Sequence, residues 1–79
     1  MRILLFARLR DIARAGSLER QVPPACTVED VWSALAAEWP ELTAFRPALS
    51  AAVNAEFAPF SALVNEGDEV AFLPPVSGG

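Results

Sequence analysis

An amphipathic helix in the middle of the chain is the feature that most constrains the fold. Thr27 is a favourable N-cap, and Asp30 three residues later completes a capping-box pattern. Five large apolar residues then recur at helical spacing: Val28, Val31, Trp32, Leu35 and Trp39. Pro40 ends the helix, because proline lacks the amide hydrogen and crowds the preceding turn. We therefore expect one main helix packed against a small sheet.

Short apolar segments on both sides of this helix predict the strands of that sheet. The segments are residues 2–9, 17–22, 49–53, 56–58 and 69–73. One face of the first segment is entirely apolar and is expected to meet the core: Ile3, Leu5, Ala7 and Leu9. In the last segment, Val70 and Phe72 share one face and Leu73 points to the other.

Two further segments connect these elements. Residues 10–16 predict a helical turn that ends at Gly16. Residues 41–47 predict a connector with one more turn, in which Leu42 and Phe45 point inward.

The order of the elements predicts an α+β fold. The first two strands can form a hairpin, and the last strand finds its most apolar neighbour in the first, to which it would run parallel. A small mixed sheet with one main helix across one face is the ubiquitin-like β-grasp, although other small α+β packings fit the same pattern. We expect a β-grasp domain over residues 1–75 and a flexible tail over 76–79.

Several residue types that carry chemistry are absent or rare. The 79 residues include no histidine, no lysine and one cysteine. This excludes histidine-based catalysis, a Walker A motif and a Cys-x-x-Cys zinc site. The net charge of −4 argues against nucleic acid as a partner, and no apolar run could span a bilayer. We expect a cytoplasmic domain that is a poor candidate for a self-sufficient enzyme.

The C-terminal tail is the most informative part of the chain. Pro74 and Pro75 stiffen its base, and Val76, Ser77, Gly78 and Gly79 follow. Five extended residues reach about 16 Å, and the last three have little bulk, so a narrow channel could admit them. The alternative is an ordinary frayed terminus.

The sequence resembles a known family along its whole length. Residues 67–79 read Gly-Asp-Glu-Val-Ala-Phe-Leu-Pro-Pro-Val-Ser-Gly-Gly and closely resemble the C-terminus of the MoaD family, the small subunits of molybdopterin synthase. Residues 5–10 are similar to the family's first strand and the arginine after it. Residues 52–57 are similar to its mid-chain turn, with Ala55 where a glycine is often seen.

The resemblance implies that the reactive group is the C-terminal carboxylate of Gly79. An E1-like (MoeB-like) adenylyltransferase would use ATP to convert it to an acyl-adenylate, and a persulfide sulfur donor would then displace AMP to leave a thiocarboxylate. The tail would next enter the large (MoaE-like) subunit of molybdopterin synthase and donate sulfur to cyclic pyranopterin monophosphate. No cofactor would be bound permanently.

A partner-binding surface is expected on the sheet face away from the helix. Strand alternation points Phe6 and Leu73 to that face, and we expect Phe57 to join them. The resemblance places the matching positions at the partner interface, and we assign Arg10 and Pro74 to it as well. The alternatives are apolar side chains half-covered by loops, and an Arg10 that merely caps the first turn.

Two further candidate features are the uneven distribution of charge along the chain and the lone cysteine. Residues 1–20 carry five arginines against two acids, and residues 21–79 carry one arginine against eight acids. This asymmetry suggests electrostatic steering to partners, or simply a solvated surface. Cys26 lies beside the helix start, and we expect it to be structural.

Three other functions fit the same features. Related carriers feed thiamine thiazole, cysteine or thiolated tRNA. A ubiquitin-like modifier would be joined through Gly79 to lysines of other proteins. A β-grasp adaptor with an inert tail would keep its full function after removal of the last two residues.

Overall fold

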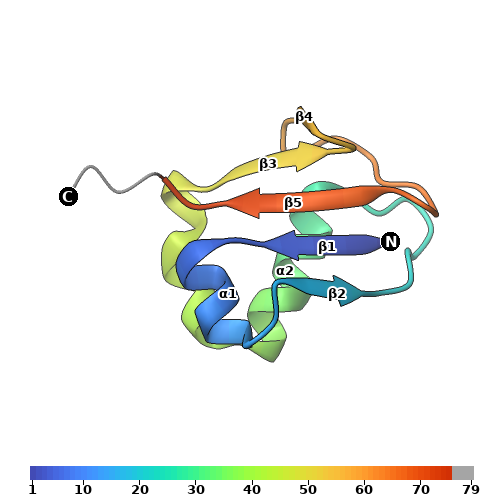
Figure 1. Ribbon diagram of the computed structural model, residues 1–79. Coiled ribbons are helices and arrows are strands. Elements are labelled where there is room, and N and C mark those ends of the chain that lie inside the picture. Colours follow the sequence, from blue (N-terminus) through green and yellow to red (C-terminus); the bar gives the residue numbers. More distant parts are fainter. Residues whose placement is uncertain (76–79) are drawn as a thin grey trace.

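The structure, a computed structural model, describes residues 1–75 (Figure 1). Its elements in chain order are β1 (Arg2–Leu5), α1 (Ala7–Ala13), β2 (Ser17–Glu19), α2 (Val28–Glu38), the 3-10 helix η1 (Pro40–Ala48), β3 (Ser50–Val53), β4 (Glu56–Phe57) and β5 (Glu69–Leu73). The helices lie on one side of a single sheet, as Figure 1 shows.

The sheet has five strands in the order β2-β1-β5-β3-β4. The central pair, β1 and β5, is parallel, with Ile3 opposite Val70 and Leu5 opposite Phe72. The pairs β1–β2, β3–β5 and β3–β4 are antiparallel. The predicted mixed sheet and parallel central pair are confirmed, and this arrangement is the β-grasp.

The first strand is shorter than predicted. It ends at Leu5, and α1 begins at Ala7, whose φ of 51° lies in the left-handed region and breaks the extended run. The apolar face predicted for one strand is therefore divided, because Leu9 reaches the core from α1 while Ala7 is exposed.

The segment after β1 also differs from the prediction. The helix ends at Ala13 rather than at Gly16, and Arg14 is its C-cap in a left-handed conformation. Strands β1 and β2 pair as expected, and α1 lies between them, where the sequence predicted a helical turn over residues 10–16. Strand β2 stops at Glu19, so Val22 packs against the core from a loop.

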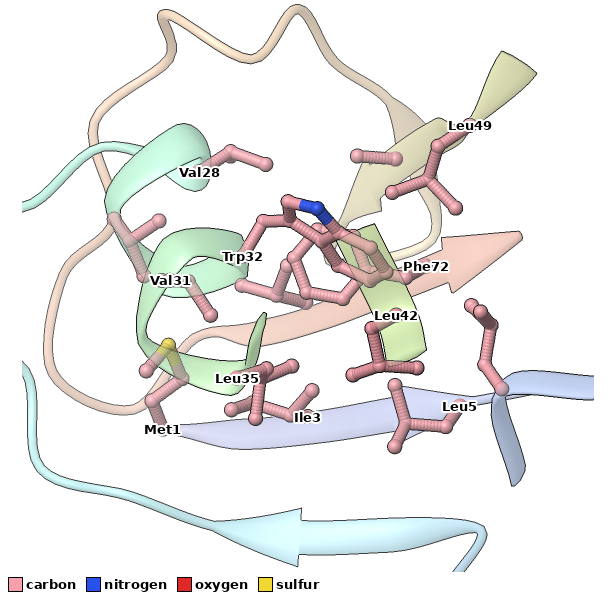
Figure 2. Close-up of a cluster of buried hydrophobic side chains, with 14 of the residues drawn as sticks. Met1, Ile3, Leu5, Val28, Val31, Trp32, Leu35, Leu42, Leu49 and Phe72 are labelled. Atoms are coloured by element: carbon pink, nitrogen blue, oxygen red, sulfur yellow. The ribbon is translucent and has the colours of Figure 1, made fainter. Parts of the chain in front are cut away.

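Helix α2 has the predicted boundaries and capping box. The Thr27 side chain accepts a hydrogen bond from the backbone N–H of Asp30, and the Asp30 carboxylate accepts one from the N–H of Thr27. Its buried face packs on β1 and β5 (Figure 2). The rings of Trp32 and Phe72 lie 5.1 Å apart and are tilted by 59°, a favourable aromatic arrangement.

The connector forms η1, and the expectation that Leu42 points inward is confirmed. Phe45 is half-buried and also packs against the core. Arg46 ties η1 to the start of α2, because its guanidinium donates to both oxygens of Glu29 at 2.7 to 3.2 Å. The same guanidinium lies 3.6 Å from the centre of the Phe60 ring. Within residues 1–75, no helix is long and apolar enough to cross a membrane.

Candidate docking face and C-terminal tail

The sheet face opposite α2 is open and mostly apolar at its centre. Strand register places one outward-facing row across four strands: Leu4 of β1, Ala71 of β5, Ala52 of β3 and Phe57 of β4. Phe6 and Leu73 follow at the end of the face where β1 and β5 finish. Two alanines between larger side chains leave a trough in the middle of the row.

That trough is a groove of about 290 Å³. We call it the open-face groove, and its lining residues are Leu4, Phe6, Ala52, Ala55, Phe57, Glu69, Ala71 and Leu73. Phe57 is 81% exposed and Phe6 is 44% exposed, so both rings are available to a partner. Exposed aromatic side chains around a concave apolar surface are typical of an interface.

A short β-turn holds Phe57 at the edge of the groove. Asn54 and Ala55 connect β3 to β4, and both have positive φ. The Asn54 side chain donates to the Asp68 carboxylate and accepts from the N–H of Glu69, which fixes the turn against the start of β5. The Asn54 amide and then the backbone N–H of Asn65 hold the pKa of Asp68 below its ordinary value.

The base of the tail follows β5, a central strand that is hydrogen-bonded to a neighbour on each side. Strand β5 pairs with β1 up to Phe72 and with β3 up to Leu73. Pro74 is half-buried and Pro75 is exposed directly after it. The described chain therefore ends two residues after Leu73, which lines the open-face groove.

The structure brings together part of the expected site. Phe6, Phe57 and Leu73 line one groove, and Pro74 follows Leu73. Arg10 is exposed on α1 and is not among the groove residues; its side chain passes beside Gly16. The remaining predicted site residues lie outside the described residues: Val76, Ser77, Gly78 and Gly79.

The floor of the groove was not predicted from the sequence. Ala52 and Ala71 carry no functional group that would mark them as site residues, yet their small size creates the depression. Strand alternation could have indicated them, because both share the outward face with Leu4 and Leu73.

Cys26 is buried, as expected for a structural residue. Burial, and then the negative charge of Asp30, raise the pKa of its thiol. A raised pKa lowers the thiolate fraction, which is the nucleophilic form. Cys26 is therefore poorly suited to act as a nucleophile.

Comparison with known proteins identifies the family. The sequence profile of the ThiS family matches residues 3–79. The chain belongs to the ThiS family. Because the match covers nearly all of the chain, it includes the Gly-Gly end as well as the β-grasp domain.

Two curated relatives carry the same name. The molybdopterin synthase sulfur carrier subunit of Arabidopsis thaliana is 34% identical over 79 residues, covering 100% of this chain and 82% of the relative. The protein of the same name from Escherichia coli is 32% identical over 81 residues, covering 100% of this chain and 99% of the relative. They confirm the resemblance to the MoaD family.

A solved structure confirms the β-grasp fold. SAMP1, the small archaeal modifier protein 1 of Haloferax volcanii, superposes with a TM-score of 0.84 and is 31% identical. The alignment covers 99% of this chain and 97% of SAMP1. This chain is thus similar in sequence to proteins named as sulfur carrier subunits and in structure to one named as a modifier protein.

Proposed function

We propose that this protein is the sulfur carrier subunit of molybdopterin synthase. The observation that carries the proposal is the whole-length match to curated sulfur carrier subunits, which runs through the last residue of this chain. The protein would act in the cytoplasm, where ATP and its partner enzymes are available. Its working group would be its own terminus.

The chemistry requires activation, because a carboxylate is a poor electrophile. An E1-like adenylyltransferase would join the Gly79 carboxylate to AMP and release pyrophosphate from ATP. The terminal sulfur of a persulfide would attack the acyl carbon and AMP would leave. Two electrons from a thiol would then break the remaining S–S bond and release the thiocarboxylate.

The second half of the cycle would take place on the large subunit of molybdopterin synthase. The thiocarboxylate is ionised at neutral pH and nucleophilic, so its sulfur can bond to a carbon of cyclic pyranopterin monophosphate and displace an oxygen substituent. Water would then hydrolyse the acyl–sulfur bond, which leaves the sulfur on the pterin and returns the Gly79 carboxylate. Two such donations would build the dithiolene. The partners would supply the catalytic side chains, which fits a chain with no histidine and no lysine.

The open-face groove is the proposed docking surface for the large subunit. Phe6, Phe57 and Leu73 would provide apolar anchors next to the point where the tail begins. Pro74 would contribute directly after Leu73, and Arg10 would contribute from α1, outside the groove. Docking there would bring the base of the tail to the partner in one defined position, because β5 is paired on both sides.

Reconstitution of the synthase tests this proposal. The chain would be prepared with a C-terminal thiocarboxylate by cleaving an intein fusion with sulfide, and mixed with the large subunit and cyclic pyranopterin monophosphate. We expect molybdopterin from the thiocarboxylated chain and none from the carboxylate form. Equal product from a chain lacking Gly79 would contradict the proposal.

A protein modifier is the second candidate, and the likeness to SAMP1 favours it. In that case the activated Gly79 would form isopeptide bonds with lysines of other proteins. A digest of cellular protein would contain lysines linked to Gly79 if the chain is a modifier, and would lack them if it only carries sulfur.

A further inference from the structure

Helix α1 carries positive charge that the described part of the molecule leaves unpaired. Arg8 and Arg10 lie in this helix and Arg14 caps it, and all three are exposed. Within residues 1–75, the arginines that form ion pairs are Arg2, Arg20 and Arg46. The only acid in the helix is Asp11, so α1 and its cap have a net charge of +2.

This charge lies at the end of the molecule from which the tail departs. Strands β1 and β5 are parallel with Leu5 opposite Phe72, so the chain leaves β1 next to Leu73 and enters α1 two residues later. Figure 1 shows α1 at the same end of the sheet as the end of β5. The charged helix therefore flanks the base of the tail.

The opposite end of the sheet is acidic. Glu19 and Glu69 both face Arg2 at the start of β1, and Glu66 lies 3.6 Å from the amino group of Met1. Glu56 on β4 and Asp68 before β5 lie at the same end. Helix α1 and its cap are thus a positively charged element at the tail end of a chain whose net charge is −4.

We propose that Arg8 and Arg14 steer the tail end of this protein toward an acidic surface on the E1-like activating enzyme. The inference rests on the proposed function, since it assumes that such an enzyme receives Gly79. It concerns Arg8 and Arg14 because Arg10 is already assigned to the docking surface. Exposed charges of this kind raise the rate of encounter more than the affinity.

Steering suits a carrier that must leave its partner after each cycle. Attraction between solvated charges orients the approach, while the charges stay hydrated and hold the complex only weakly. The molecule's charge polarity also disfavours approach by its acidic end, because that end would be repelled by the same surface. The partner's surface next to the cleft for the tail is therefore expected to be acidic.

Association kinetics with the purified E1-like enzyme test this inference. The double variant Arg8→Gln/Arg14→Gln is compared with Arg2→Gln/Arg20→Gln, which removes the same charge and residue type from the other end of the sheet. We expect the first variant to associate about tenfold more slowly at low ionic strength, with the difference largely lost at about 0.5 M salt, where charges are screened. The control should stay within about twofold of the original chain.

Three results would overturn the inference: equal association rates for Arg8→Gln/Arg14→Gln and the original chain, an equal loss in the control variant, or a loss that persists at high salt. Association is measured without ATP, so it does not depend on adenylation. Sulfur loading of the original chain is measured separately by mass. If the original chain gains sulfur but Arg8→Gln/Arg14→Gln associates as fast as the original chain, steering is refuted and the proposed function stands. If the original chain binds the enzyme but gains no sulfur, the proposed function is refuted.

Discussion

At the scale of single residues, the turn before β4 is the clearest case of backbone strain. Asn54 and Ala55 have φ of 52° and 70° in a two-residue hairpin loop. This geometry favours Asn followed by Gly, because the second position has no room for a Cβ without strain. We predict that Ala55→Gly raises the free energy of unfolding by about 1 kcal/mol, measured by urea denaturation.

The matched control for this turn is Ala37→Gly in α2. Ala37 is exposed in a helix, where glycine costs about 1 kcal/mol relative to alanine, so this variant should be less stable. The strain argument fails if Ala55→Gly is no more stable than the original chain.

The Glu29–Arg46 pair gives a prediction of pH dependence. The hydrogen bonds from Arg46 hold the pKa of Glu29 below its ordinary value of 4.5. A lowered folded-state pKa stabilises the protein above that ordinary value, and the contribution disappears as the pH falls through the lowered one. Glu29→Gln should therefore reduce stability at about pH 7 and have no effect in acid.

The size of this effect is limited by solvent. Both side chains are more than a third exposed, so we expect a loss below about 1 kcal/mol in urea titrations across the pH series. Glu41→Gln is the control, because Glu41 forms no ion pair within the described residues. A loss for Glu29→Gln that is as large in acid as at neutral pH would exclude the ion pair as its cause.

At the scale of elements, the N-terminus of α2 depends on its capping box. Thr27→Ala removes the acceptor for the N–H of Asp30, and we expect a loss of about 1 kcal/mol in thermal or urea unfolding. Thr43→Ala in η1 is exposed and should change stability by less than about 0.5 kcal/mol. Equal effects from the two substitutions would show that the capping box contributes nothing specific.

Helix α2 was predictable from the sequence over its full length, whereas α1 was predicted only as a turn over residues 10–16 and its start at Ala7 was missed. Around α2, a capping box, a helical apolar period and Pro40 all indicate one structure. Between β1 and α1, alternate apolar residues from Ile3 to Leu9 satisfy a strand pattern, while Leu9 and Ile12 also satisfy a helical one. The strand is interrupted at Ala7, which has a left-handed conformation. No glycine or proline in the sequence marks this position.

At the scale of the whole molecule, a substitution in the open-face groove should weaken partner binding without lowering the stability of the fold. Phe57 is 81% exposed, so Phe57→Ser should leave stability within about 0.5 kcal/mol. It should weaken binding to the large subunit of molybdopterin synthase about tenfold or more, measured by calorimetry, because aromatic anchors dominate interfaces. Leu63→Ser is the control: Leu63 is 62% exposed but lies outside the groove.

If Leu63→Ser weakens binding as much as Phe57→Ser, the groove is not the docking surface.

The sequence predicted the rim of this surface, because Phe6 and Leu73 follow strand alternation. It did not predict the depression itself, since a trough made by Ala52 and Ala71 depends on the register of β3 against β5. Register is set by the whole sheet rather than by either strand.

The proposed sulfur carrier function depends most on the chemistry of Gly79. The protein would be incubated with an E1-like adenylyltransferase, ATP, a persulfide donor and a thiol reductant, and its intact mass would be measured. We predict a gain equal to the replacement of one oxygen by sulfur, located at Gly79 and absent from a chain that lacks this residue. No gain, or sulfur found on Cys26 instead, would contradict the account.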